Sequence, residues 1–209
     1  MNQKWFTSDT HYNHKNIVRG TTSWEEFQEG SSHQSTRDFD TLKEHNDALV
    51  DAINSTVGEN HELYHLGDWS FGGHESIKEF RDRIKCKNIH LIFGNHDQHI
   101  EPVSSIYRPL FASVQHYLEL KLKIDSQKAG KYGKTRIILS HFAMRVWNQS
   151  HHGAIHLYGH SHGTLPGIGK SMDVGVDTNN LFPYHLDEIL EKMKGEETMI
   201  VDHHNETTN

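Results

Sequence analysis

The segment NIHLIFGNHD at residues 88–97 contains the pattern on which the fold prediction depends. It begins with a short apolar run, rich in Ile and Leu, which predicts a buried strand. Gly94 ends this run, and the polar residues Asn95, His96 and Asp97 follow it directly. Side chains that can bind ions or transfer protons follow the predicted strand directly. This pattern predicts a functional site at the carboxyl end of the strand.

The same arrangement recurs along the chain. Short apolar runs bounded by turn residues predict strands at 5–6, 61–66, 88–93, 136–139 and 154–158. Polar residues that can bind metals follow these runs, namely Asp9, His11, Asp68, Asn95, His96, Asp97, His141, His160 and His162. Ligands of α/β sheets bind at the carboxyl ends of strands, so we expect one edge of the fold to gather these side chains.

Other segments complete the prediction of the fold. An alternating run at 114–124 and a short run at 171–176 predict further strands, and residues 128–134 predict a hairpin connection. Apolar residues recur at helical spacing over 39–53, 77–84 and 185–194. Because helices and strands interleave, the fold class is expected to be α/β or α+β.

Length and composition predict one domain over residues 1–194, with a mobile loop at 20–36 and a disordered polar tail at 195–209. The absence of a signal peptide and of a long apolar segment predicts a cytoplasmic protein that does not enter membranes. A formal net charge of −7 argues against a broad nucleic-acid surface, because such surfaces neutralise phosphates with Lys and Arg.

The chain contains 20 histidines and one cysteine, Cys86, which makes metal binding the first explanation to test. Oxygen and nitrogen ligands without thiolate suit Mn, Fe, Co, Ni or Zn. Seven candidate ligands are too many for one tetrahedral site, but they fit two divalent metal ions that share a carboxylate. Gly67, Gly94 and Gly159 precede candidate ligands, where the backbone must turn sharply and pass close to an ion.

Five short motifs resemble those of the calcineurin-like metallophosphoesterase superfamily, in the same order. They are DTH at 9–11, GD at 67–68, GNHD at 94–97, SH at 140–141 and GHSH at 159–162. The longer segments SDTHYNHKNIV, SHFAMRVWNQSHHGAIHLYGHSHG and MDVGVD resemble a small, capless bacterial or phage-type branch of it. The resemblance implies a four-layer αββα sandwich with two central mixed sheets and a metal site at the carboxyl ends of the strands.

The resemblance also implies a role for each motif residue. Asp9, His11 and His162 would hold a first metal ion, and Asn95, His141 and His160 a second. Asp68 would bridge the two ions, and a metal-bridging hydroxide would attack the phosphorus. His96 would protonate the leaving group, supported by Asp97.

The implied activity is hydrolysis of a phosphate ester, with a small molecule or nucleotide as the substrate. Phosphodiesters of nucleotide type are favoured over phosphomonoesters, and a non-catalytic scaffold with the same fold is the alternative from another class. A nuclease that acts on polymers is disfavoured by the acidic charge. Protein Ser/Thr phosphatases of this superfamily carry GDxxDRG where residues 67–73 here form GDWSFGG, so that activity is not expected.

Simpler roles remain open for several residues. Each candidate ligand, taken singly, could cap a helix or form a turn, and Asp97 could serve as an N-cap. His96 could hold the site together without donating a proton. His14 and Arg145 are candidate substrate contacts, but His14 could equally start a helix and Arg145 could be an ordinary surface arginine. Four histidines within strand runs are expected to be core or face residues: His65, His90, His116 and His156.

Overall fold

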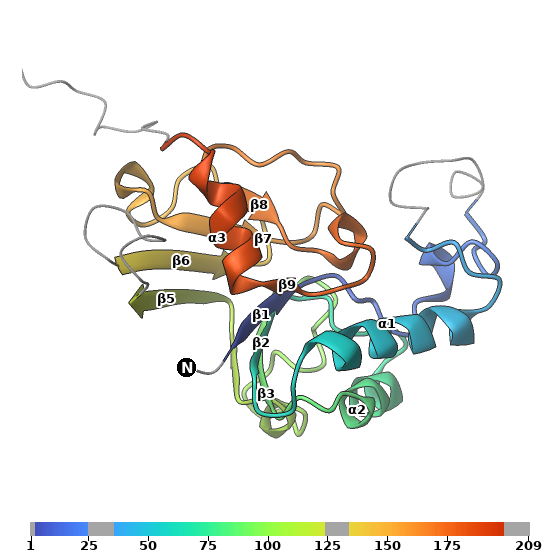
Figure 1. Ribbon diagram of the computed structural model, residues 1–209. Helices are drawn as coiled ribbons and strands as arrows, with labels where there is room; N and C mark the ends of the chain where they lie inside the picture. Colours follow the sequence, from blue (N-terminus) through green and yellow to red (C-terminus); the bar gives the residue numbers. More distant parts are fainter. Residues whose placement is uncertain (1–2, 25–35, 124–133, 199–209) are drawn as a thin grey trace, which may run out of the picture.

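The computed structural model describes residues 3–24, 36–123 and 134–198. A first sheet has the strand order β4-β3-β2-β1-β9, in which β9 is antiparallel and the other strands are parallel (Figure 1). Its strands are β1 Lys4–Thr7, β2 Glu62–His65, β3 Asn88–Ile92, β4 Ser113–Gln115 and β9 Tyr184–His185.

A second sheet has the order β5-β6-β7-β8, with β5 antiparallel to three parallel strands. Its strands are β5 Tyr117–Lys123, β6 Lys134–Ser140, β7 Ile155–Tyr158 and β8 Ser171–Asp173. Both sheets are therefore mixed, and together with the helices they confirm the predicted α+β sandwich.

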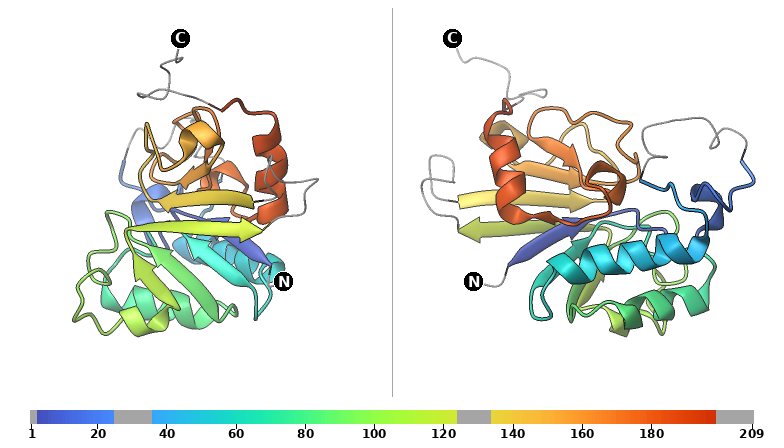
Figure 2. Two further views of the ribbon diagram at one scale, coloured as in Figure 1. Left: turned by 90° about the vertical axis from the view of Figure 1, so that its left-hand side faces the viewer. Right: turned by 45° about the vertical axis from the view of Figure 1, so that its right-hand side comes forward.

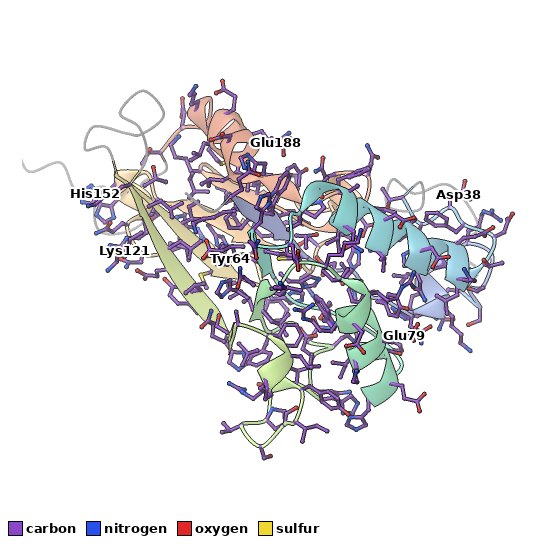
Figure 3. The ribbon with its side chains drawn as sticks, turned by 60° about the horizontal axis from the view of Figure 1, so that its bottom comes forward. Asp38, Tyr64, Glu79, Lys121, His152 and Glu188 are labelled. Atoms are coloured by element: carbon purple, nitrogen blue, oxygen red, sulfur yellow. The ribbon has the colours of Figure 1, made fainter. Side chains whose placement is uncertain are left out.

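The core between the sheets is formed by inward-facing residues of both. Phe6 and Tyr64 of the first sheet belong to the same buried cluster as Ile137 and Leu157 of the second. Figure 3 shows Tyr64 near the middle of the molecule. Burial of this apolar surface from both sides fixes the two sheets face to face.

Two helices cover the outer face of the first sheet, α1 Leu42–Thr56 and α2 His74–Arg83 (Figure 2). A capping box between Thr41 and Glu44 starts α1. The third helix, α3 Leu186–Lys194, lies on the second sheet's side of the molecule and packs its apolar stripe into the cluster shared by the sheets. These helices confirm the three predicted ones within a few residues.

The alternating run at 114–124 is not one strand, as predicted, but two in different sheets. β4 ends at Gln115, the exposed His116 follows, and β5 begins at Tyr117 in the second sheet. A period of two predicts extended backbone but carries no information about which partner each half will pair with. The predicted strand at 171–176 also ends early, at Asp173. Val176, the last residue predicted for this strand, instead begins a 3-10 helix, Val176–Thr178.

Parts of three predicted segments lie outside the described residues: 25–35 of the loop at 20–36, 128–133 of the hairpin, and 199–209 of the tail. Within the described ranges, no helix combines the length and apolar character that crossing a bilayer requires. In Figure 2, β1 and β6 point toward the same end of the sandwich.

Candidate metal centre

The chain segments that follow β1 and β2 run side by side beyond the ends of the strands. The amide of Asp9 donates to the Gly67 carbonyl at 3.0 Å, and the amide of His11 donates to the Asp68 carbonyl at 3.0 Å. The Thr10 hydroxyl donates to the Trp69 carbonyl at 2.7 Å. These bonds place the side chains of Asp9, His11 and Asp68 at one edge of the first sheet.

Most of the candidate ligands have left-handed backbone conformations, which are uncommon for residues other than glycine. Their φ angles are 56° for Asp9, 44° for His11, 57° for Asp68, 66° for His160 and 47° for His162. Such conformations cost free energy and concentrate at functional sites, where the surrounding structure enforces them. Backbone geometry thus marks the same loops as the sequence motifs, independently of them.

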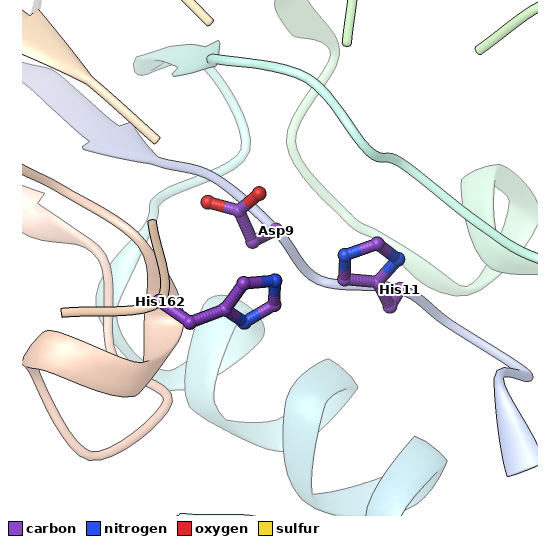
Figure 4. A group of neighbouring side chains, drawn as sticks. All are labelled: Asp9, His11 and His162. Atoms are coloured by element: carbon purple, nitrogen blue, oxygen red, sulfur yellow. The ribbon is translucent and has the colours of Figure 1, made fainter. Parts of the chain in front are cut away.

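Asp9, His11 and His162 form the first half of the candidate centre. One potential ligand atom from each lies within 4.8 Å of the others, and Figure 4 shows the rings of His11 and His162 facing each other beside Asp9. Asp9 and His11 are almost fully buried, whereas the side chain of His162 is 27% exposed. The Asp9 carboxylate also accepts bonds from the His160 amide, at 2.9 and 3.0 Å, which joins the loop after β7 to the loop after β1.

The second half contains Asp68, His141, His160 and Asn95. Ligand atoms of Asp68, His141 and His160 lie within 4.8 Å of one another. The Oδ1 atom of Asn95 lies 3.0 Å from His141 Nε2 and 3.0 Å from His160 Nδ1. The side chain of His141 is buried, while Asn95 and His160 are exposed, so this half opens toward solvent.

Asp68 lies between the two halves. Its Oδ2 atom is 3.4 Å from His11 Nε2 and 3.5 Å from His141 Nε2, and Oδ1 accepts the amide hydrogen of His96 at 2.9 Å. Two ligands of one tetrahedral ion, each about 2.1 Å from it, are separated by about 3.4 Å. The Asp68 carboxylate therefore has the spacing required of a residue shared by an ion on each side.

The electrostatics of the buried carboxylates also fit cations. Burial, together with the nearby Asp68 and Asp173 charges, raises the pKa of Asp9 to about 8 despite the opposing effect of His162. A buried carboxylate of this kind is costly to ionise unless a positive charge compensates it. Divalent ions would supply that charge, and the oxygen and imidazole donors present suit Mn, Fe, Co, Ni or Zn.

His96 and Asp97 follow β3 and differ in environment. His96 is half-buried and forms a third cluster with His11 and Asp68, with ligand atoms within 4.8 Å. The buried Asp97 carboxylate accepts the backbone amides of Asp68 at 2.9 Å, Trp69 at 3.0 Å and Gly94 at 2.8 Å. Asp97 thus holds two loops of the centre in place, so any support that it gives to His96 acts through the backbone.

The two candidate substrate contacts lie in different places. His14 is 6% exposed and borders a pocket of about 520 Å³ that His11, His96 and His162 also border. It also occupies the N-cap position of a 3-10 helix, Lys15–Ile17, although its side chain makes no capping bond. Arg145 is exposed on the segment after β6 and does not border this pocket, so its contact with a substrate stays a prediction.

Two buried residues that the sequence analysis did not single out support the first half. Asp177 accepts the Nδ1 hydrogen of His162 at 2.7 Å and pairs with Arg37, whose Nε and Nη2 atoms both lie 2.8 Å from its oxygens. Arg37 also donates to the Asp9 carbonyl at 2.7 Å. Although burial opposes ionisation, the Arg37 charge holds the pKa of Asp177 well below its usual range. Because Nδ1 is bonded to Asp177, Nε2 is the nitrogen of His162 that is left to bind a metal ion.

The chain has recognisable relatives, although no protein-family model matches it. It is 25% identical over 185 residues to the Gene 66 protein of Mycobacterium phage L5, and the matched region covers 79% of this chain and 80% of that protein. It is 25% identical over 199 residues to the uncharacterized protein MJ1445 of Methanocaldococcus jannaschii, covering 91% and 90% of the two chains. A solved structure, the protein of unknown function AQ665 from Aquifex aeolicus, superposes with a TM-score of 0.59 at 17% identity, over 92% of this chain and 100% of that chain. The structural likeness concerns the fold alone.

Proposed function

We propose that this protein is a phosphoesterase that depends on two divalent metal ions and resembles the calcineurin-like metallophosphoesterases. The observation that carries the proposal is the position of Asp68, whose Oδ2 atom lies 3.4 Å from His11 and 3.5 Å from His141. A carboxylate between two ligand groups suits a pair of ions, and such pairs are typical of phosphate-ester hydrolysis.

When bound, the two ions would lower the pKa of water toward about 7 and offset the negative charge of the phosphate. The protein's own residues would position the ester and supply the proton. His96 lies beside Asp68 and His11, and there it would donate a proton to the oxygen that leaves phosphorus. Asp97 holds the loop of His96 against that of Asp68 through three backbone bonds.

The test combines metal analysis with an esterase assay. Purified protein loaded with Mn should bind about two ions per chain and hydrolyse bis(4-nitrophenyl) phosphate, and a chelator should abolish the activity until Mn is restored. Asp68→Asn should lose both ions or bind them much more weakly and lose at least about 100-fold in kcat. Asp38→Asn, the same change at a surface residue whose side chain is 60% exposed, is the matched control and should behave like the wild type.

Three outcomes would count against the proposal. Protein that binds no Mn, or that stays active after complete chelation, has no metal-dependent chemistry. Protein that binds two ions but hydrolyses neither diesters nor monoesters would instead be a metal-binding scaffold.

A further inference from the structure

Two pockets meet at His96. The large pocket, about 520 Å³, is bordered by the candidate ligands His11, His160 and His162 and by the apolar side chains of Ile17 and Trp24. The small pocket, about 220 Å³, lies beside the start of α2 and is bordered by Phe71, Gly72, Gly73, Ile77, Ile100 and His96. Ligand sites usually measure about 300 to 1,000 Å³, so the small pocket suits only a fragment of a substrate.

A partition of three aromatic rings separates the pockets: His14, Phe71 and His96. The ring of Phe71 is stacked on His14, with centroids 3.9 Å apart and an interplanar angle of 13°. It also makes an edge contact with His96, at a centroid distance of 5.4 Å. Phe71 borders only the small pocket and His14 only the large one, so this ring pair, with His96, forms the wall between them.

The charges around the pockets limit what each can hold. Among the described residues that border the large pocket, Arg37 is the only arginine or lysine, and its guanidinium is bonded to Asp177 and to the Asp9 carbonyl. The described residues that border the small pocket include neither arginine nor lysine. Additional phosphate groups would need cationic partners, so uncharged organic groups fit both pockets better.

Building on the proposed phosphoesterase function, we propose that the substrate is a phosphodiester with one uncharged organic group on each side of His96. The leaving group would occupy the small pocket and the retained group the large one. A phosphomonoester has only one organic group and would leave one of the two pockets empty.

The direction of the reaction decides which group lies where. The attacking and leaving oxygens are roughly in line through phosphorus. Candidate ligands border the large pocket but not the small one, so attack from the metal side would direct the leaving group toward the small pocket. The water oxygen forms the new P–O bond, and the bond to the leaving oxygen breaks with its electron pair. His96 gives that oxygen a proton and regains one from the attacking water, so the products are an alcohol and a phosphomonoester.

The experiment varies the size of the leaving group while the retained group stays the same. Methyl 4-nitrophenyl phosphate and methyl 4-methylumbelliferyl phosphate have leaving groups of similar acidity and different size. The Mn-loaded wild type should prefer the smaller leaving group by about tenfold or more in kcat/KM, since a pocket of limited volume discriminates between groups of different size on this scale. It should also hydrolyse the monoester 4-nitrophenyl phosphate at least about tenfold more slowly than the methyl diester.

Phe71→Ala should merge the pockets and reduce the size preference to within about threefold, with Mn stoichiometry unchanged. Folding should survive, because Phe71 is 39% exposed, and Phe71→Leu, which keeps most of the wall, should give an intermediate ratio. Phe142→Ala is the matched control. That phenylalanine is 52% exposed and contacts His141 and His160 edge-on, but it borders neither pocket, so the ratio should stay at the wild-type value.

A wild-type ratio near one, or a ratio that Phe71→Ala leaves unchanged, would overturn the assignment of the small pocket while the phosphoesterase activity stands. Faster turnover of the monoester than of the diester would overturn the diester preference. If the Mn-loaded wild type hydrolyses none of the three esters, the proposed function and this inference both fail.

Discussion

Asp177 and Arg37 form a buried ion pair behind the first half of the candidate centre. The side chains are 0% and 2% exposed, and the pair is joined to the centre at two points, His162 Nδ1 and the Asp9 carbonyl. A carboxylate that fixes the orientation of a ligating histidine raises metal affinity without touching the metal. The pair therefore ties the position of one ligand to that of another from a distant part of the sequence.

Asp177→Asn should weaken the binding of one of the two Mn ions by about 10- to 100-fold, because the amide no longer fixes His162 with a negative charge. It should also lower stability, since Arg37 would then be a buried cation without its partner. Calorimetric titration with Mn measures the first effect and urea unfolding the second. Asp38→Asn, the same change at a surface residue whose side chain is 60% exposed, is the control and should change neither Mn affinity nor stability appreciably.

His96 can be tested through the chemistry of the leaving group. His96→Asn should keep both metals and slow hydrolysis of alkyl esters by about 10²- to 10⁴-fold, the usual contribution of a positioned proton donor. Nitrophenyl esters should be affected only mildly, because nitrophenolate leaves without a proton. Rates on both ester types, measured beside Mn stoichiometry, distinguish the roles. Equal losses on both types together with lost metal would make His96 a structural residue of the centre.

Chemical type and position within motifs were enough to predict which residues gather at the site. All seven candidate ligands follow strand ends, and the structure brings them together. Arg37 could not be predicted in this way, because it follows a polar segment that resembles a surface loop and its burial depends on a pairing with Asp177 across 140 residues. Arg145 lies on an exposed segment, and its contact with phosphate, which rests on its residue type alone, stays a prediction.

At the scale of the elements, the centre depends on glycines that allow the loops after the strands to approach one another. A Cβ atom at Gly94 would lie 2.2 Å from Asp68 Oδ1, and one at Gly159 would lie 2.5 Å from Asp9 Oδ2. Gly67 also requires its positive φ of 99°. The sequence predicted these positions because each glycine lies between an apolar run and a candidate ligand.

Gly94→Ala should displace the Asp68 carboxylate and weaken Mn binding at least about tenfold, while unfolding free energy falls by about 1 to 3 kcal/mol from overpacking. The effect would come from lack of space, not from a forbidden backbone conformation, because Gly94 is not among the residues with positive φ. Gly195→Ala is the control, since φ there is −77° and a Cβ would meet nothing within 4 Å. Unchanged Mn affinity in Gly94→Ala would show that Asp68 does not need this close approach.

Partner choice between strands was the part of the fold that the sequence did not predict. The alternating residues of 114–124 satisfy the strand pattern on both sides of His116, yet β4 pairs with β3 and β5 pairs with β6. Pairing is decided by packing across the whole sandwich, which a local period does not contain. The positions of β1, β2, β3, β6 and β7 could be predicted to within two residues because each contains a short apolar run near turn residues, although β6 begins at Lys134, which was predicted to belong to the hairpin connection.

At the scale of the whole molecule, the 20 histidines divide between the candidate centre and other environments, including the core. His65 and His156 are fully buried strand residues, as predicted, and His45 is buried on α1. Burial lowers the pKa to about 3 for His65, to about 4 for His156 and to about 3 for His45, where the Arg37 charge adds to the effect. These imidazoles are neutral in the folded protein but bind protons in the unfolded chain below about pH 6.5. Acid should therefore destabilise the fold below that pH.

His156 offers a direct test of this acid sensitivity. Its Nε2 accepts the Met144 amide at 3.0 Å and its Nδ1 lies 3.2 Å from the Ile138 carbonyl, so the folded protein holds a neutral ring. In the unfolded chain the ring binds a proton below about pH 6.5, whereas in the folded protein it does so only near pH 4. Its contribution to stability is therefore complete above about pH 6.5 and is lost as the pH falls toward 4, by about 1.4 kcal/mol per pH unit and about 3 kcal/mol in all.

His156→Gln removes this titration. Between pH 6 and 5, the free energy of unfolding of the variant should therefore fall by about 1.4 kcal/mol per pH unit less than that of the wild type. Urea unfolding at a series of pH values measures the difference, with His152→Gln at an exposed histidine as the control. If wild type and His156→Gln lose stability in parallel, His156 is not held neutral by the fold.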